Sequence, residues 1–158
     1  MNGRSLNPNR TVFLMLIVSC SLFGGCITDE SRKEAMINNV ISLHDEVSAE
    51  HGTPQQFQSV DVRREGDNGI VFEYIHQPEI LLDKSQFTDQ VVRKGVVTDY
   101  KKSGAWNELE EMFDLGIYFR FINKNADGSI LADTRLDQSH LDSLKTDTDQ
   151  GEQQPDSE

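Results

Sequence analysis

The sequence of 158 residues carries 15 lysines and arginines against 27 aspartates and glutamates, a formal net charge of −12. Such an acidic surface repels phosphate backbones, because polyanion binding depends on clusters of basic side chains. The charge therefore argues against a nucleic-acid partner, and the length is typical of one domain.

The first notable region is an apolar run at residues 12–23, which follows Arg4 and Arg10 with no acidic residue before it. A basic start followed by an apolar centre is typical of a secretory signal peptide. As a helix, the run would extend about 18 Å, well short of the ~30 Å hydrocarbon core of a bilayer. We therefore expect a processing signal, with an uncleaved anchor as the alternative.

The run ends in Leu22-Phe23-Gly24-Gly25-Cys26, which resembles the lipobox of bacterial lipoproteins. The resemblance implies that the Cys26 thiol takes a diacylglyceryl group, that cleavage removes residues 1–25, and that the new N-terminus is acylated. Two or three acyl chains anchor a protein stably to a membrane, whereas one does not. Ile17-Val18-Ser19-Cys20 also fits a lipobox, but processing at Cys20 leaves a short apolar run, so Cys26 is the preferred site.

Ile27 follows the expected lipid site. In enteric lipoproteins an Asp at this position favours retention in the inner membrane. By that resemblance Ile27 points to the outer membrane, facing the periplasm, if the organism has two membranes. Cleavage before Cys26 also leaves thirteen basic residues against twenty-seven acidic ones, a net charge of −14. Because both cysteines lie in the opening stretch, the mature domain has no thiol for a disulfide, a metal or a nucleophile.

The first half of the mature chain predicts a helix and a hairpin. A capping box at Ser31–Glu34 and an apolar stripe predict a helix from Ser31 to His51, which Gly52 ends. Residues 57–64 alternate between apolar and polar side chains, and residues 70–75 are rich in β-branched and aromatic ones. The turn-forming residues 65–69 separate the two ranges. We therefore expect two antiparallel strands.

The second half predicts two helices and a second hairpin. A capping-box-like start at Asp83–Gln86 opens a helix that runs to Gly104, and a short helix follows from Trp106 until Gly116. Residues 116–122 form the strongest predicted strand, and they turn through residues 123–128 into a last strand at residues 129–136. The strand sequences at 69–75 and 116–122 are similar, and paired in register they would place Glu73 opposite Arg120.

Together these elements predict an α+β fold in the order α-β-β-α-α-β-β, with an antiparallel sheet of about four strands and helices on one face. We expect a lipidated linker at residues 26–30, a single domain at residues 31–136 and an acidic tail at residues 137–158. The tail composition cannot bury enough apolar surface to offset ordering entropy, so it should be mostly disordered, above all from about Asp147.

The sequence gives only weak signals for a metal site or a catalytic site. Asn123-x-Asn125-x-Asp127-Gly128 resembles the front half of a calcium loop. Thr134, however, stands where such a loop needs an acid that binds calcium through both oxygens, so a hairpin turn is preferred. The histidines show no metal-ligand spacing. We expect His44 at the edge of the core. The other three should lie in solvent; they are His51, His76 and His140. The acidic residues of the short helix should form its solvated face; they are Glu108, Glu110, Glu111 and Asp114.

The sequence therefore predicts no catalytic residue, no metal and no cofactor. We expect a membrane-tethered, non-enzymatic module that binds or assembles with another envelope protein. The alternative is a lipoprotein that binds a small ligand or inhibitor on an exposed aromatic sheet face, and a third hypothesis is an envelope hydrolase that uses the helix carboxylates. The aromatic contact surface would contain Tyr74, Tyr118, Phe119 and Phe121. The mature sequence loosely resembles small exported lipoproteins of unestablished function, which transfers no site residues.

Overall fold

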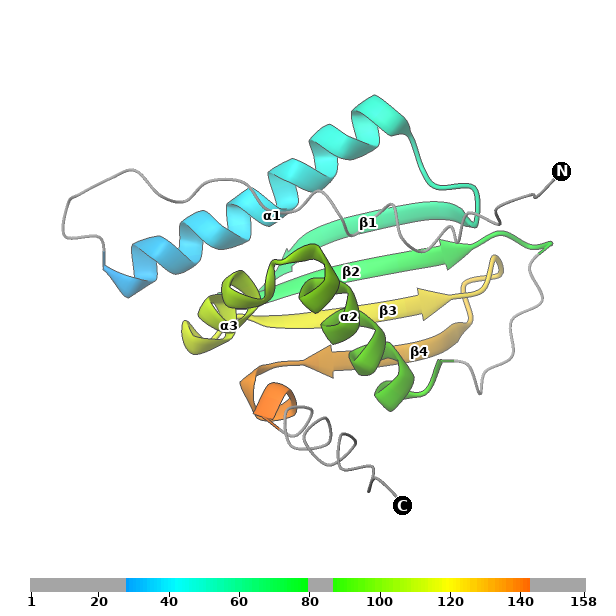
Figure 1. The fold of residues 1–158 in the computed structure, drawn as a ribbon. Helices are drawn as coiled ribbons and strands as arrows, with labels where there is room; N and C mark the ends of the chain where they lie inside the picture. Colours follow the sequence, from blue (N-terminus) through cyan, green and yellow to red (C-terminus); the bar gives the residue numbers. More distant parts are fainter. Residues whose placement is uncertain (1–27, 80–86, 143–158) are drawn as a thin grey trace, which may run out of the picture.

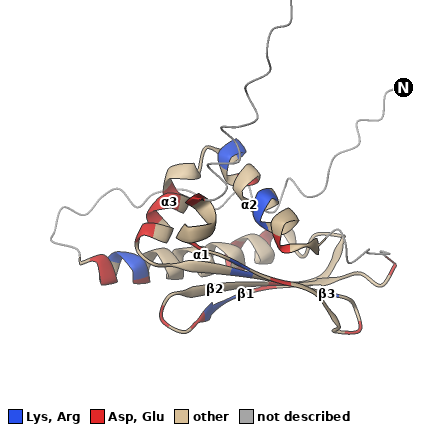
Figure 2. Ribbon diagram, turned by 90° about the horizontal axis from the view of Figure 1, so that it is seen from below, with Lys and Arg blue, Asp and Glu red and all other residues tan. Residues whose placement is uncertain are grey.

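The structure is a computed structural model that describes residues 28–79 and 87–142. Four strands form one sheet, and the three long helices pack on the same face of it (Figures 1 and 2). In chain order the elements are α1 (Asp29–His51), β1 (Phe57–Glu65), β2 (Gly69–His76), α2 (Asp89–Ser103), α3 (Trp106–Asp114), β3 (Tyr118–Lys124) and β4 (Ile130–Leu136). The predicted α+β class and element order are confirmed.

The helices α1 and α2 begin at threonines that the sequence prediction did not use. Thr28 has an extended backbone, and its hydroxyl accepts the N–H of Ser31 at 3.2 Å, so α1 begins before the expected capping box. Thr88 caps α2 in the same way by accepting the N–H of Val91 at 3.4 Å. The start that the sequence predicted for α2, at Asp83–Gln86, lies outside the described residues.

The sheet order is β1-β2-β3-β4, and its two outer pairs are antiparallel hairpins as predicted. The central pair, β2 with β3, is parallel, so the sheet is mixed and not antiparallel throughout. The physical reason is the connection between them: α2 and α3 carry the chain back across the sheet before β3 begins, as a parallel pair requires. Two separate hairpins are therefore joined by one helical crossover (Figure 1).

The expected pairing of Glu73 with Arg120 is wrong by two residues. β2 and β3 are neighbours, but Glu73 lies opposite Ile122, and Arg120 lies opposite Val71. Because the offset is an even number, the two side chains still lie on the same face of the sheet. Each finds another partner there, as described below.

The core lies between the sheet and the helices and is rich in phenylalanine. The ring centroids of Phe72 and Phe121 are 5.1 Å apart in a stacked arrangement, and Phe119 meets Phe113 edge-on at 5.4 Å. Leu141, in a helical turn at residues 138–142, has no exposed surface and joins the same core. The packed domain therefore extends past the predicted boundary at residue 136. No helix of the described ranges has both the length and the apolar character that crossing a membrane requires.

Candidate interaction surface

Three of the four aromatic residues expected on an exposed sheet face lie in the core. Phe119 and Phe121 are 0% and 2% exposed, and Tyr74 is 9% exposed. Strand alternation turns all three toward the helices, because burying large aromatic rings stabilises that interface most. Only Tyr118 lies on the opposite face. The expected aromatic contact surface is therefore wrong, and the structure provides no support for a ligand groove built on these rings.

The face of the sheet opposite the helices, called here the open face, has no described helix over it (Figure 2). Its side chains follow from the register of the four strands. One row across the sheet carries three arginines, and the next row carries three acids. The arginines are Arg63, Arg120 and Arg135, and the acids are Asp61, Glu73 and Asp133.

The first group of ion pairs on the open face is centred on Glu73. Its carboxylate accepts from Lys124 Nζ at 2.6 Å and from Arg63 Nη2 at 3.0 Å. Arg63 also donates to Asp61 at 2.5 Å. The hydrogen bond from Lys124, followed by that from Arg63, holds the pKa of the Glu73 carboxyl below its usual value. These contacts join β1, β2 and β3 on one surface.

The second group is centred on Arg120. Its guanidinium binds Asp133 through two hydrogen bonds of 2.7 and 2.6 Å and reaches Glu65 at 2.5 Å. The bidentate geometry is the strongest arrangement of an arginine with a carboxylate. The pKa of Arg120 is raised, mainly by the Asp133 hydrogen bond, and the pKa of Asp133 is correspondingly lowered. The two groups together, defined by Asp61, Arg63, Glu65, Glu73, Arg120, Lys124 and Asp133, are called here the ion-pair network.

Tyr118 closes one end of the network. Its hydroxyl donates to Glu65 Oε2 at 3.0 Å, and the Arg135 guanidinium lies 3.8 Å from the centroid of its ring. Tyr118 and Glu65 are on β3 and β1, so the tyrosine must cross β2, and it does so over Gly69. A Cβ atom at Gly69 would lie 2.5 Å from the Tyr118 ring and 2.7 Å from the Glu65 carbonyl oxygen. Gly69 is therefore required for this contact.

The network covers apolar side chains on its own face. Val71 and Ile122 lie on the open face by register, yet they are only 1% and 7% exposed. The long arginine and lysine side chains cover them while their charged groups stay near water. The open face is therefore a polar surface with an apolar layer beneath it.

The sequence contained a signal for this surface that the prediction did not use. Charges alternate at every second residue of β1, in Asp61, Arg63 and Glu65, and again in Asp133 and Arg135 of β4. A period of two places such residues on one face of a strand. Most of the aromatic side chains, by contrast, lie on the face that the helices cover.

The histidines lie in different environments. His44 is half-buried and lies 3.3 Å from the Ser48 hydroxyl, close to the predicted place at the core edge. His76, expected in solvent, is buried between Phe57 and Phe87, with its Nε2 atom 3.1 Å from Asn123 Oδ1. Burial lowers the pKa of His76 below its usual value, and the Asn123 hydrogen bond opposes that shift. The two others are His51, which is exposed, and His140, which is half-buried beside Asp137.

The loop that resembles a calcium site is a hairpin turn between β3 and β4, as the sequence analysis preferred. Asp127 accepts the N–H of Ser129 at 2.9 Å, and Gly128 has a φ of 84°. Within the described ranges no cluster of histidine, cysteine, aspartate and glutamate has the arrangement of a metal site.

The carboxylates of α3 lie in different environments. Glu111 forms an ion pair with Arg32 of α1, and Asp114 is exposed. Glu108 is half-buried, and its Oε2 atom has no hydrogen-bond partner among the described residues. Glu110 is also half-buried.

The lipidation prediction at Cys26 and its competitor Cys20 lie outside the described residues. No protein-family model matches the chain, and no curated protein matches it either. One solved structure to which the chain shows some similarity is that of the type II secretion system pilotin AspS from Vibrio cholerae. The identity is 19% and the TM-score 0.44, over 70% of this chain and 94% of that one. At this level of similarity the function has to be argued from the residues of this chain itself.

Proposed function

We propose that this protein is a lipid-anchored, non-enzymatic interaction module of the cell envelope that presents the open face of its sheet to another envelope protein. The observation that carries the proposal is the composition of the open face. Tyrosine and arginine are the residues that most often dominate the energy of protein interfaces. Here Tyr118 and three arginines lie together on a face that no described helix covers.

The chemistry of the open face suits a protein partner. An arginine has five N–H donors, so a guanidinium that already binds one carboxylate keeps donors for a second molecule. The ion-pair network also fixes the long side chains in place before binding, which lowers the entropy lost at an interface. A partner with its own alternating charges would meet a preorganised surface.

The anchor follows from the lipobox resemblance and the start of the domain. Thr28, which caps α1, lies two residues after Cys26, so a chain lipidated at Cys26 places the folded domain within about 7 Å of the lipid site. A domain held so close to a membrane can engage a partner embedded in, or lying on, the same membrane.

The anchoring half of the proposal is tested with Cys26→Ser, and Cys20→Ser is the matched control. Mass spectrometry of the mature wild-type N-terminus should find acylated Cys26. Cys26→Ser should retain residues before 26 or leave the membrane fraction, whereas Cys20→Ser should behave like the wild type. A reversed result, with Cys20→Ser unprocessed, would move the lipid site to Cys20.

The binding half is tested by photo-crosslinking in cells. A crosslinking residue placed at Arg63 or Arg135, both exposed on the open face, should capture the same envelope protein. The control position is Glu46 on the exposed side of α1, which should not capture it. Equal capture from Glu46, or none from the open face, would contradict this half while leaving the anchor untouched.

A further inference from the structure

The outer face of α2 differs from every other charged surface of the described residues. All other described lysines and arginines form an ion pair with a carboxylate. Within the same residues, Lys94, Lys101 and Lys102 form none, and all three belong to α2. In the part of the chain that the structure describes, which has an excess of acid, these are the cations without a carboxylate partner.

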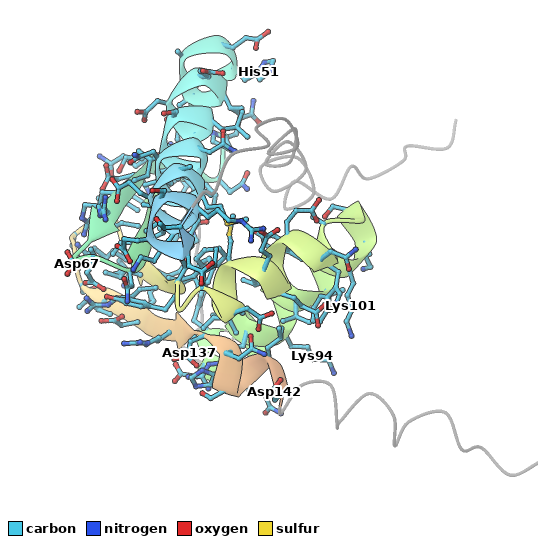
Figure 3. All side chains as sticks on the ribbon, turned by 90° about the vertical axis from the view of Figure 1, so that its left-hand side faces the viewer. His51, Asp67, Lys94, Lys101, Asp137 and Asp142 are labelled. Carbon is cyan, nitrogen blue, oxygen red and sulfur yellow. The ribbon has the colours of Figure 1, made fainter. Side chains whose placement is uncertain are left out.

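The three lysines share one side of the helix. α2 buries Val96, Val97 and Tyr100 against the core, and the helical period places Lys94 and Lys102 away from it. Lys101 lies at the edge of the same side, over the Trp106 ring. Figure 3 labels Lys94 and Lys101 on the outer side of α2, and Figure 2 shows the blue segments of α2 in the layer farthest from the sheet. The three lysines are called here the lysine face.

The lysine face keeps its charge available to an anion. Lys101 lies with its Nζ atom 4.8 Å from the centroid of the Trp106 ring, a contact that leaves the ammonium exposed to solvent. The acid at the start of α2, Asp89, is already bound by Thr134 and Arg93. Asp99, half-buried, is the other acid of the helix. An approaching polyanion therefore meets three exposed cations on one side of a helix.

We propose that the acidic segment at residues 143–158 of this chain binds along the lysine face. The segment contains Asp147, Asp149, Glu152, Asp156 and Glu158 against the single base Lys145. Charge complementarity favours this segment over an anionic lipid, because the mature chain carries a net charge of −14 and a bilayer would have to approach all of it.

The segment starts close enough to reach the whole face. Arg93 Nε of α2 donates to the backbone oxygen of Arg135 at 2.8 Å, which joins the helix to the end of β4. From Arg135 the described chain continues to Asp142, and the segment begins at the next residue. Sixteen residues can span up to about 50 Å, whereas the fifteen residues of α2 extend about 22 Å.

Because the acidic segment is tethered to the domain, even a weak contact with the lysine face can be populated. Exposed ion pairs are individually weak, but a segment joined covalently to the domain has an effective concentration on the order of millimolar at α2. The contact should depend strongly on salt, because the Debye length falls to about 3 Å at 1 M ionic strength. A bound segment would keep other anions from the lysine face until a stronger competitor displaced it. The inference is independent of lipidation and of the open face.

The test uses the processed chain, residues 26–158, with Cys26→Ser, which contains no thiol. Gln150→Cys then carries a nitroxide in the middle of the acidic segment without changing its charge. At low ionic strength the amide NMR signals of Lys94, Thr98 and Lys102 should broaden. At about 1 M salt the broadening should disappear.

Two charge variants of the lysine face complete the test. Lys94→Gln, Lys101→Gln and Lys102→Gln together should abolish the broadening, and the matched triple arginine variant should retain it. The proposal is wrong if broadening is absent at low salt, persists in the glutamine variant or is centred on the open face. It is also wrong if the α2 amides respond to phosphatidylglycerol vesicles but not to the nitroxide, since the face would then belong to a lipid.

Discussion

The open face and the lysine face are both charged, but they differ in how the charges are used. On the open face each arginine and lysine has a carboxylate oxygen within 3.1 Å of one of its nitrogen atoms, either on another strand or nearby in the sequence. On the lysine face no ammonium group forms an ion pair with a carboxylate of the described residues. Paired charges hold the strands and their own side chains in a fixed geometry, whereas unpaired charges keep their full attraction for an anion.

This difference leads to different responses to mutation and to salt. Glu73 is only 16% exposed in its side chain and Lys124 25%, so added salt screens their interaction less than it screens an exposed charge. Changes on the open face should therefore alter stability as well as partner binding, whereas changes on the lysine face should alter binding alone.

The largest expected effect is at Gly69. Gly69→Ala places a methyl group 2.5 Å from the Tyr118 ring and 2.7 Å from a backbone oxygen of β1. The ring must leave Glu65, and the backbone must shift, at a cost of about 1–3 kcal/mol. Urea unfolding followed by circular dichroism measures the loss.

A double-mutant cycle separates the two clashes at Gly69. Tyr118→Ala in the Gly69→Ala background should cost less than Tyr118→Ala alone, because the ring no longer clashes. The backbone contact with Glu65 remains, so recovery should be partial. Additive effects of the two substitutions would show that Tyr118 does not need the glycine.

The next effect is at Arg120 and depends on pH. Arg120→Gln should cost about 1 kcal/mol near neutral pH, since the side chain is about a third exposed and its ion pairs are partly screened. The pKa of Asp133 is lowered in the folded state by Arg120. That stabilisation is present above the unfolded pKa and is lost as pH falls through the folded pKa.

The wild-type protein should therefore lose stability on acidification below about pH 5 more steeply than Arg120→Gln does. Urea midpoints measured from pH 6 to pH 3 provide the comparison. The control is Arg32→Gln, which removes an ion pair with Glu111 between α1 and α3 and leaves the open face intact. Parallel curves for the wild type and Arg120→Gln would contradict the role of Arg120.

A smaller effect of opposite sign is expected within α2. A Cβ atom at Gly95 meets nothing within 4 Å, and the residue lies inside the helix. Gly95→Ala should therefore stabilise the protein by about 0.5–1 kcal/mol, because alanine restricts the unfolded chain. Gly104→Ala is the control and should destabilise, since Gly104 ends α2 with a φ of 79°. Thermal unfolding measures both.

How much of this could be predicted from the sequence depends on the range of the interactions. The element order and both hairpins follow from local patterns, such as the turn before Gly69 and the strand from Tyr118. The parallel pairing of β2 with β3 depends on where the α2–α3 crossover returns the chain, which no local pattern encodes. Helix starts were misplaced because Thr28 and Thr88 can cap as well as the residues chosen.

The candidate surface was harder to predict because the sequence does not say which face the helices cover. Strand alternation separates Tyr118 from Phe119, but either side could have been the core. The register between strands then decides the partners, and a shift of two residues gives Glu73 to Lys124 and Arg120 to Asp133. Glu73 and Lys124 are 51 residues apart in the chain, so no local pattern could pair them.

The smallest expected effect is on the stability of the lysine-face variants. Replacing Lys94, Lys101 and Lys102 together with glutamine should change the free energy of unfolding by less than about 0.5 kcal/mol, because no carboxylate loses a partner. Urea unfolding of the triple variant beside Arg120→Gln makes the comparison direct. If the triple variant lost as much stability as Arg120→Gln, the lysines would be holding the fold together, and the two charged faces would not differ in the way argued here.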